Sequence, residues 1–509
     1  MNLLELNWGL LAPELTIAIV AVILTFADLV MRKGDRKVFG WLSIIGIILS
    51  LYFVIQDLGQ PAQELLEGSY RVDSFASLFK LIFLVGTLFV LVMSINYVEK
   101  KEIKHDGEFY YLFLTALLGA MFMASSADII TLYIGLELLS ISSYIMAGIR
   151  KFNLKSNEAA YKYVIIGGVS SAIFLYGTSF IYGVTGSTNI FVIAERIQEA
   201  FNGGFDFYIY LGFFMMLVGL SYKISAVPSY MWSPDVYEGA ATPVTAFLSV
   251  ISKAAGFAII IRLFITVFTP IVVEVVNNNP VFFFFNKMTL FLAVISGLTM
   301  IIGNTLALRQ TNVKRMMAYS SVAQAGYLLV PLATMTMASE QLISVDIRNI
   351  IFYLMAYLFM NLGVFTVITI VNKDAGTEDL KSFAGLYHRS PFVAIAMTFF
   401  LMSLAGLPIS AGFIGKFNIF ISALTTKSYW LAGIMVATSV ISYFYYFNIV
   451  RQMYMRPGHT EAKLSIPFSM QFVILLTFIG TFVIGLVPNV MLDFITKNFD
   501  LFNMLTLGQ

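Results

Sequence analysis

The chain contains no cysteine, so disulfides, thiolate-bound metals and cysteine-ligated iron–sulfur clusters are excluded. Only three histidines occur in 509 residues, His105, His388 and His459, and all three lie in polar connecting segments. No GxGxxG or GxxxxGK[ST] motif occurs in a strand–helix context, so nucleotide binding has no support. We therefore expect no cofactor, no metal and no electron carrier in this chain.

Charge is also scarce. Charged residues make up 12% of the chain and hydrophobic residues 59%, whereas about a quarter of a soluble protein is charged. Apolar runs of 18 or more residues recur from end to end, and each can cross the roughly 30 Å of a bilayer's hydrocarbon as a helix. No lysine or arginine precedes the first apolar run, so a cleaved signal peptide is not expected. The composition predicts an all-α, polytopic integral membrane protein.

Hydropathy places about fourteen transmembrane helices. They cover residues 9–30, 38–56, 76–98, 109–125, 127–149, 160–185, 207–232, 241–268, 284–306, 314–337, 347–371, 391–424, 428–452 and 467–490. The connections between them are about twenty residues at most, too short to form a soluble domain of their own.

The distribution of lysine and arginine orients these spans. Alternate connections carry 20 basic residues on one side and 6 on the other. Because basic residues concentrate in cytoplasmic connections, the chain termini are predicted to lie on the non-cytoplasmic side. The sparse set consists of Arg71, Arg196, Lys287, Arg348, Lys427 and Lys497.

Two spans combine a Gly/Pro interruption with a lysine. Lys223 precedes Pro228 in the seventh span, and Pro408 precedes Lys416 in the twelfth. Proline removes a backbone donor, and interrupted helices in corresponding positions of two halves indicate a transport site. The spacing predicts two inverted five-helix repeats, residues 109–268 and 284–452, between an N-terminal unit 1–108 and a C-terminal helix within 467–509.

Four ionisable residues lie at mid-span: Glu137, Lys223, Lys253 and Lys416. Each costs roughly 2.5–3.5 kcal/mol on insertion scales, and such residues usually mark ion pathways. Burial favours the neutral form of a lysine and a nearby carboxylate favours the charged form, so Glu137 is the expected partner of Lys223. Lys253 and Lys416 have no acidic neighbour in sequence and are expected to be relay sites.

Other charged residues are expected near the membrane surface. Lys80 and Arg262 lie close to span ends and are predicted to extend their charges toward the headgroups. Glu14, Asp28 and Asp128 are predicted to be interfacial.

Four segments carry a resemblance to a known family. They read KISAVPSYMWSPDVYEGAATPVTAFLS at 223–249, NEAAYKYVIIGGVSSAIFLYGTSFIYGVTGSTN at 157–189, QTNVKRMMAYSSVAQAGYLL at 310–329 and SLAGLPISAGFIGKF at 403–417. They resemble subunit N of bacterial respiratory complex I (NADH-quinone oxidoreductase), a family of antiporter-like membrane subunits. The SPDVYEGAATPVTAF segment favours subunit N over the related L and M subunits and over Mrp-type antiporter subunits.

The resemblance implies a subunit of the bacterial plasma membrane that moves protons while partner subunits oxidise NADH and reduce quinone. Flavin and iron–sulfur clusters are then expected only in those partners. By position, Glu137 and Lys223 match the family's glutamate–lysine pair. Lys253 matches the central connecting lysine, and Lys416 matches the lysine of the second broken helix.

Two positions depart from the family's pattern. After Pro228, where many relatives have Phe-His, this chain has Ser229 and Tyr230, and Gln324 stands where histidine is frequent. Neither tyrosine nor glutamine titrates near neutral pH, so protons are expected to pass these points through water or hydroxyl groups.

Two alternatives stay open. The chain could belong to an Mrp-type Na⁺/H⁺ antiporter or a related membrane hydrogenase complex, because the fold would be the same. It could also be a scaffold whose buried charges only specify helix packing, in which case Lys253→Met would be tolerated.

Overall fold

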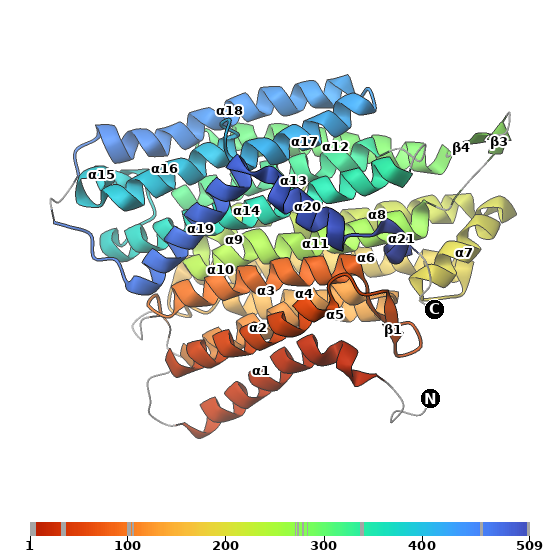
Figure 1. The fold of residues 1–509 in the computed structure, drawn as a ribbon, viewed down its shortest axis with the longest axis horizontal. Helices are drawn as coiled ribbons and strands as arrows, with labels where there is room; N and C mark the ends of the chain where they lie inside the picture. Colours follow the sequence, from red (N-terminus) through yellow and green to blue (C-terminus); the bar gives the residue numbers. More distant parts are fainter. Residues whose placement is uncertain are drawn as a thin grey trace.

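The computed structural model describes residues 7–31, 37–98, 103, 106–269, 271, 274–276, 279–281, 283–335, 340–458 and 462–505. These residues are overwhelmingly helical, and the long helices lie side by side in one bundle (Figure 1). The predicted all-α membrane fold is confirmed. Some predicted features lie outside the described residues, namely His105, His459, Arg32, Lys33, Arg36, Lys100, Lys101 and Lys104.

The elements follow one another in four groups. The N-terminal group is η1 (Trp8–Leu11), α1 (Ala12–Val30), α2 (Lys37–Asp57), β1 (Gln63–Leu65), β2 (Tyr70–Val72) and α3 (Ser74–Ser94). The second is α4 (Asp106–Ser125), α5 (Ile129–Ala147), α6 (Leu154–Thr185), α7 (Ile190–Ala200), η2 (Phe201–Phe205), α8 (Asp206–Ile224), α9 (Trp232–Gly239), α10 (Thr242–Phe247), η3 (Leu248–Ser252), α11 (Lys253–Leu263) and η4 (Phe264–Phe268). The third is β3 (Glu274–Val276), β4 (Asn279–Val281), α12 (Phe283–Ala307), α13 (Val313–Thr334), α14 (Glu340–Ala375), η5 (Leu380–Phe383), α15 (Leu386–Arg389), α16 (Pro391–Ala405), α17 (Ala411–Thr425) and α18 (Tyr429–Met455). The last is α19 (Phe468–Leu486), α20 (Pro488–Asn498) and α21 (Leu501–Leu505).

Each predicted span coincides with a helix, or a pair of half-helices, of the structure. Within the described residues, 12 stretches are long and apolar enough to cross a membrane. The 22-residue α13 and the pair of 15-residue half-helices α16 and α17 complete the predicted fourteen.

Several predicted boundaries are wrong. The seventh span does not end at residue 232, because α8 stops at Ile224 and a separate short helix, α9, follows the break. The eleventh span begins at Glu340 rather than at 347. The connection after α6 contains α7, whose N-terminus is capped by the Asn189 side chain accepting from the backbone N–H groups of Phe191 and Val192.

Two central segments carry the core of the bundle. The most apolar windows of Thr242–Phe268 and Glu340–Ala375 are 100% and 94% buried, whereas that of Tyr429–Met455 is only 33% buried. Large apolar side chains on peripheral helices are exposed, such as Phe26 on α1 and Phe444 on α18, as expected of surfaces that face lipid. Polar side chains on the two central segments therefore face protein.

The first and last described elements lie at the same end of the bundle, where both contact β2 (Figure 1). The Tyr70 hydroxyl donates to the Leu10 carbonyl at 3.5 Å, and the Arg71 guanidinium donates to the Asn503 carbonyl at 2.6 Å. An even number of crossings likewise brings both ends of the chain to the same side of the bundle.

Candidate functional site

The first broken helix lies between α8 and α9. Ser225 adopts a left-handed conformation with φ 59° and ends α8. The backbone groups that the break frees find partners in the protein, as an apolar environment demands. The Ala226 N–H donates to the Ser221 carbonyl at 2.8 Å, and the Trp232 indole donates to the Tyr222 carbonyl at 3.0 Å. The protein itself therefore satisfies backbone groups at this break.

Lys223 lies in the last turn of α8, where the helix dipole favours a cation. Its side chain is 4% exposed, and its ammonium donates to the Ser140 hydroxyl at 3.0 Å. Glu137, one turn earlier on α5, is half-buried and accepts a hydrogen bond from Ser171. No ion pair within 4.0 Å joins Lys223 to Glu137, so the expected direct contact is not present and Ser140 is the partner of Lys223.

Lys253 begins α11 directly after the π-helical turn η3, which sequence periodicity does not reveal. Its ammonium donates to both the carbonyl and the hydroxyl oxygen of Ser321 on α13. The same hydroxyl accepts from Tyr357 at 3.2 Å and lies 3.2 Å from the Tyr237 hydroxyl. Lys253 is thus held by neutral oxygens at the centre of the bundle, in agreement with the absence of an acidic neighbour in the sequence.

The helix that begins with Lys253 packs closely against Lys223. Gly256 lies one turn after Lys253, and a Cβ atom there would be 3.2 Å from the Lys223 Cγ and 2.8 Å from Ile224 Cγ2. Glycine therefore lets α11 pack directly on the aliphatic stem of Lys223.

The second broken helix lies between α16 and α17. Gly406, with φ 97°, ends α16, and the Leu407 N–H donates to the Met402 carbonyl at 2.9 Å, the bond expected of a glycine-terminated helix. Ser410 caps α17 by accepting from the Phe413 N–H at 3.4 Å. The predicted interruption before Lys416 is confirmed.

Lys416 reaches back from α17 to the end of α16. Its ammonium donates to the carbonyl oxygens of Leu404 at 2.8 Å and Ala405 at 3.2 Å, and it lies 4.6 Å from the ring centre of Tyr327. The carbonyl end of a half-helix carries partial negative charge. A dipole and an aromatic face therefore take the place of a carboxylate here.

Gln324 connects this second break to the neighbouring helices. Its amide donates to the Leu404 carbonyl at 3.3 Å and its oxygen accepts from the Tyr353 hydroxyl. Gln324 lies one turn after Ser321 on α13, so a single helix face contacts the partners of both Lys253 and Lys416. Hydrogen-bonding side chains therefore run from one lysine toward the other.

The other predicted supporting residues lie away from the lysines. Pro228 and Pro408 are exposed on the outer side of the breaks, and Tyr230 is half-buried. The Tyr230 carbonyl accepts from Ser233 at 3.0 Å. Pro228, Pro408 and Tyr230 therefore belong to the breaks themselves, whereas Gln324 belongs to the hydrogen-bonding side chains between Lys253 and Lys416.

Sequence reasoning did not identify the hydroxyl and amide groups that serve the lysines. Ser140, Ser321 and Tyr357 are all buried. The sequence alone could not single these residues out, because serine and tyrosine are common in transmembrane helices and their hydrogen-bond partners lie on other helices.

A charged cluster fixes α9 at the end of the first break. Asp235 contacts Arg315 and Lys162, each at 2.6 Å, and Glu238 contacts Arg315 at 2.9 Å and Lys155 at 2.7 Å. Burial alone raises the pKa of Asp235, but its hydrogen bonds from Lys162 and Arg315 outweigh burial and hold that pKa below its ordinary value. The pKa of Glu238 is lowered in the same way, against burial, by Lys155 and Arg315. The cluster holds α9 against α6 and α13.

The predictions for Lys80 and Arg262 are wrong. Lys80 and Glu14 are each 1% exposed and form an ion pair of 2.8 Å, and Lys80 also donates to the Tyr70 hydroxyl at 2.9 Å. Arg262 is fully buried and makes a bidentate ion pair with Asp73, at 2.8 and 3.0 Å. These cations have buried partners on distant elements and therefore do not extend to the headgroups.

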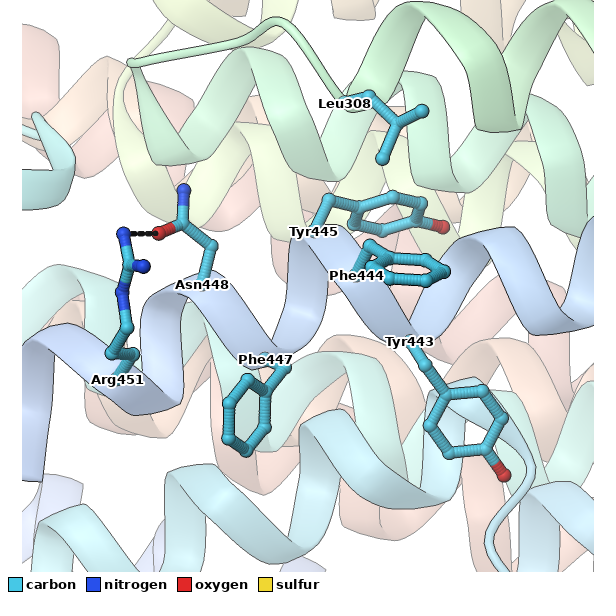
Figure 2. Close-up of a pocket in the computed structure, with 7 residues that line it drawn as sticks. All are labelled: Leu308, Tyr443, Phe444, Tyr445, Phe447, Asn448 and Arg451. Atoms are coloured by element: carbon cyan, nitrogen blue, oxygen red, sulfur yellow. Dashed lines mark hydrogen bonds between the residues drawn. The ribbon is translucent and has the colours of Figure 1, made fainter.

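Two pockets flank α18. One of about 520 Å³ is lined by Leu308 at the end of the α12 segment and by side chains of α18, among them Asn448 and Arg451, which share a 3.2 Å hydrogen bond (Figure 2). It contains none of the predicted lysines. The other, of about 350 Å³, is lined in part by Gly406, Lys416 and Tyr443, so Lys416 borders open space as well as the buried network.

No group of three or more His, Cys, Asp or Glu side chains that could bind a metal is found within the described residues.

A bundle of apolar helices in which two interrupted helices each present a buried lysine defines an antiporter-like membrane fold. The chain matches the family described as NADH:quinone oxidoreductase/Mrp antiporter, transmembrane, over residues 126–442. It is 48% identical to NADH-quinone oxidoreductase subunit N of Brevibacillus brevis over 513 residues, which cover 99% of this chain and 98% of the relative. The chain belongs to this family.

Solved structures show the same fold. A chain of the structure described as respiratory complex I from Thermus thermophilus with bound aureothin superimposes with a TM-score of 0.76 at 26% identity, covering 96% of this chain and 100% of that one. A chain of the Mrp complex from Dietzia sp. superimposes with a TM-score of 0.78 at 19% identity, covering 96% of each chain. The second likeness concerns the fold alone.

Proposed function

We propose that this chain is a proton-translocating membrane subunit of an NADH:quinone oxidoreductase complex. The subunit N identity of its relatives supports the assignment to that complex. The hydrogen-bonded side chains between Lys253 and Lys416 are the observation that supports proton transfer within this chain. In this proposal the redox chemistry belongs to partner subunits that carry flavin, iron–sulfur clusters and quinone, and the lack of cysteine leaves this chain without the usual ligands of an iron–sulfur cluster.

The four predicted residues form a relay in this proposal. Glu137 sets the charge state of Lys223 across Ser140, which lies one turn after Glu137 on α5 and contacts the Lys223 ammonium. Lys253 exchanges protons with the hydroxyl groups around Ser321. Lys416 exchanges protons with the hydrogen-bonding groups around Gln324. Each ammonium gives up one proton and becomes a neutral amine, which burial favours, until a proton from the previous site restores it.

The broken helices stabilise the ammonium groups of Lys223 and Lys416 without a carboxylate of the described residues in direct contact. Lys223 lies at the carbonyl end of α8, and Lys416 binds the carbonyl end of α16. A half-helix dipole stabilises a cation by less than a contacting carboxylate does. Both lysines can therefore lose their protons at a smaller cost than in a tight ion pair.

The order of elements supports the two inverted five-helix repeats. In 109–268 the interrupted helix α8–α9 is the fourth of five, and in 284–452 the interrupted helix α16–α17 is also the fourth of five. Five crossings per repeat place the two breaks in opposite orientations. In this proposal the chain lies in the bacterial plasma membrane, and the distribution of basic residues favours both termini on the non-cytoplasmic side.

Inverted membrane vesicles that carry Lys223→Ala test this function. With the complex still assembled, we expect loss of both NADH-driven lumen acidification and coupled NADH oxidation. Lys151→Ala is the matched control, because Lys151 is an exposed lysine in the turn before α6. Unchanged acidification and oxidation in Lys223→Ala would overturn the proposal.

The Mrp-type alternative rests on the shared fold. It predicts a different result in the same vesicles: Na⁺-dependent proton exchange collapses in Lys223→Ala while NADH-driven acidification stays intact. Purification separates the two as well, since an Mrp-type complex contains no flavin or iron–sulfur subunits.

A further inference from the structure

A stripe of polar side chains runs along the buried helix α14. Its members are Asp346, Asn349, Tyr353, Tyr357 and Asn361, and none of them is more than 8% exposed. Their spacing of three, four, four and four residues places them on one face of an α-helix. Because α14 is a central helix, this face is turned toward protein and not toward lipid.

Members of the stripe contact the helices that carry or hold the relay lysines. Asn361 donates to Ser249 at 2.7 Å, beside the turn that precedes Lys253. Tyr357 donates to Ser321, the partner of Lys253, and Tyr353 donates to Gln324, which shares the Leu404 carbonyl with Lys416. The stripe therefore follows the network from Lys253 to Lys416.

The stripe continues beyond Lys416 toward the Glu340 end of α14. Tyr353 packs on α17 beside Lys416, because a Cβ atom on Gly415 would lie 2.3 Å from the Tyr353 ring. One turn further, Asn349 donates to the Ser422 hydroxyl at 3.2 Å. Ser422 lies in the last turn of α17, and Asp346 lies one turn before Asn349 on the same face of α14. Asp346 is the end of this series.

Asp346 has no cationic partner among the residues that the structure describes. Its side chain is 5% exposed, and no ion pair within 4.0 Å involves it among the described residues. The adjacent cation, Arg348, is directed elsewhere and donates to Thr496 at 3.1 Å. An unpaired carboxylate is costly to bury, and an ionisable group inside a transmembrane helix is by default a candidate functional group.

We infer that Asp346 is the carboxylate that receives the proton released by Lys416 and passes it to the aqueous phase at the Glu340 end of α14. This inference rests on the proposed function. The Lys416 ammonium loses one proton and becomes a neutral amine, and the Asp346 carboxylate gains that proton and becomes a neutral carboxylic acid. Release of the proton to water restores the carboxylate.

Inverted vesicles that carry Asp346→Asn test the inference, with the protons translocated per NADH oxidised as the readout. We expect Asp346→Asn to lower this ratio and Asp346→Glu to retain it, in complexes that assemble normally. The matched control is Asp493→Asn, because Asp493 is an exposed carboxylate on α20. Lowered ratios in both asparagine variants would contradict a specific role for Asp346.

A spectroscopic readout separates proton transfer from a structural role. In the infrared difference spectrum between NADH-reduced and oxidised complex, Asp346→Asn should remove a C=O band of a protonated carboxylic acid. An unchanged spectrum and an unchanged proton ratio would overturn the inference.

Lys416→Ala, measured in the same vesicles, distinguishes failure of the proposed function from failure of the proposed role of Asp346. Loss of translocation in Lys416→Ala with a normal ratio in Asp346→Asn leaves the proposed function standing and refutes the role of Asp346. A normal ratio in Lys416→Ala refutes the proposed function itself.

Discussion

Lys416 and Gln324 share one acceptor, the carbonyl oxygen of Leu404, at 2.8 and 3.3 Å. This oxygen lies at the end of α16, where the helix break leaves the last carbonyl groups without intrahelical partners. A lysine from α17 and a glutamine from α13 therefore meet at one oxygen. This contact joins the second broken helix to the face of α13 that also serves Lys253.

The first prediction concerns Gln324. Gln324→Leu leaves the Tyr353 hydroxyl without its acceptor and removes one donor from Leu404, at a cost of about 1–3 kcal/mol. We expect lower NADH-driven acidification in vesicles, with normal assembly. Gln324→His should retain most of the activity, because imidazole can both donate and accept. Gln471→Leu, at an exposed glutamine of α19, is the control, and equal losses at both sites would argue against a specific role.

The second prediction concerns the contact between α11 and α8. Gly256→Ala places a methyl group against Ile224 and Lys223, and overpacking of this kind costs about 1–3 kcal/mol. We expect a lower thermal unfolding midpoint and slower proton translocation. Gly183→Ala is the control, since a Cβ at Gly183 meets nothing within 4 Å and alanine favours a helix. A Gly256→Ala protein as stable as Gly183→Ala would contradict the packing argument.

The third prediction concerns the buried pair of Glu14 and Lys80. Lys80→Met leaves an uncompensated carboxylate in the interior, which should lower the free energy of unfolding by about 3–5 kcal/mol. The double variant Glu14→Gln, Lys80→Met should recover much of this loss, since no lone charge remains. Thermal unfolding of the purified complex in detergent measures all three proteins. A double variant that is no more stable than Lys80→Met would show that the two residues do not act as a pair.

The fourth prediction concerns pH. The pKa values of Asp235 and Glu238 lie below their ordinary values of 3.8 and 4.5 in the folded protein. Their contribution to stability is therefore complete above the ordinary values and is lost as pH falls through the lowered values in the folded state. Their partners are partly exposed, so the contribution is modest.

Thermal unfolding of the parent protein and of the double variant Asp235→Asn, Glu238→Gln, measured over a range of pH, checks this pH dependence. The difference in midpoint between the two proteins should be largest at neutral pH and should shrink as the pH is lowered below about 4. A difference that stays constant across this range would contradict the assignment.

Much of the fold could be predicted because it depends on local sequence. Apolar length and the alternation of basic residues predicted the crossings, and a Gly/Pro pair beside a lysine predicted each break. Both breaks occur where expected, next to Lys223 and Lys416. The two-repeat organisation remains a prediction that the order of elements supports.

The wrong predictions concern contacts between distant segments. Lys80 pairs with Glu14 and Arg262 with Asp73, 189 residues away, and hydropathy gives the depth of a residue but not the helix that it faces. Asp346 escaped notice because the predicted eleventh span began at 347, whereas α14 begins at Glu340. The role of Ser140 between Glu137 and Lys223 likewise depends on how α5 packs against α8.

The most direct test of the account is the number of protons translocated per NADH oxidised in vesicles that carry Lys253→Met. Methionine is an unbranched side chain one atom shorter than lysine, and it removes the charge and the hydrogen bonds to Ser321. The account predicts a ratio well below that of the parent complex, at normal assembly and with Lys151→Ala unaffected. A full ratio, together with unchanged or higher thermal stability, would contradict it and would identify Lys253 as a packing residue.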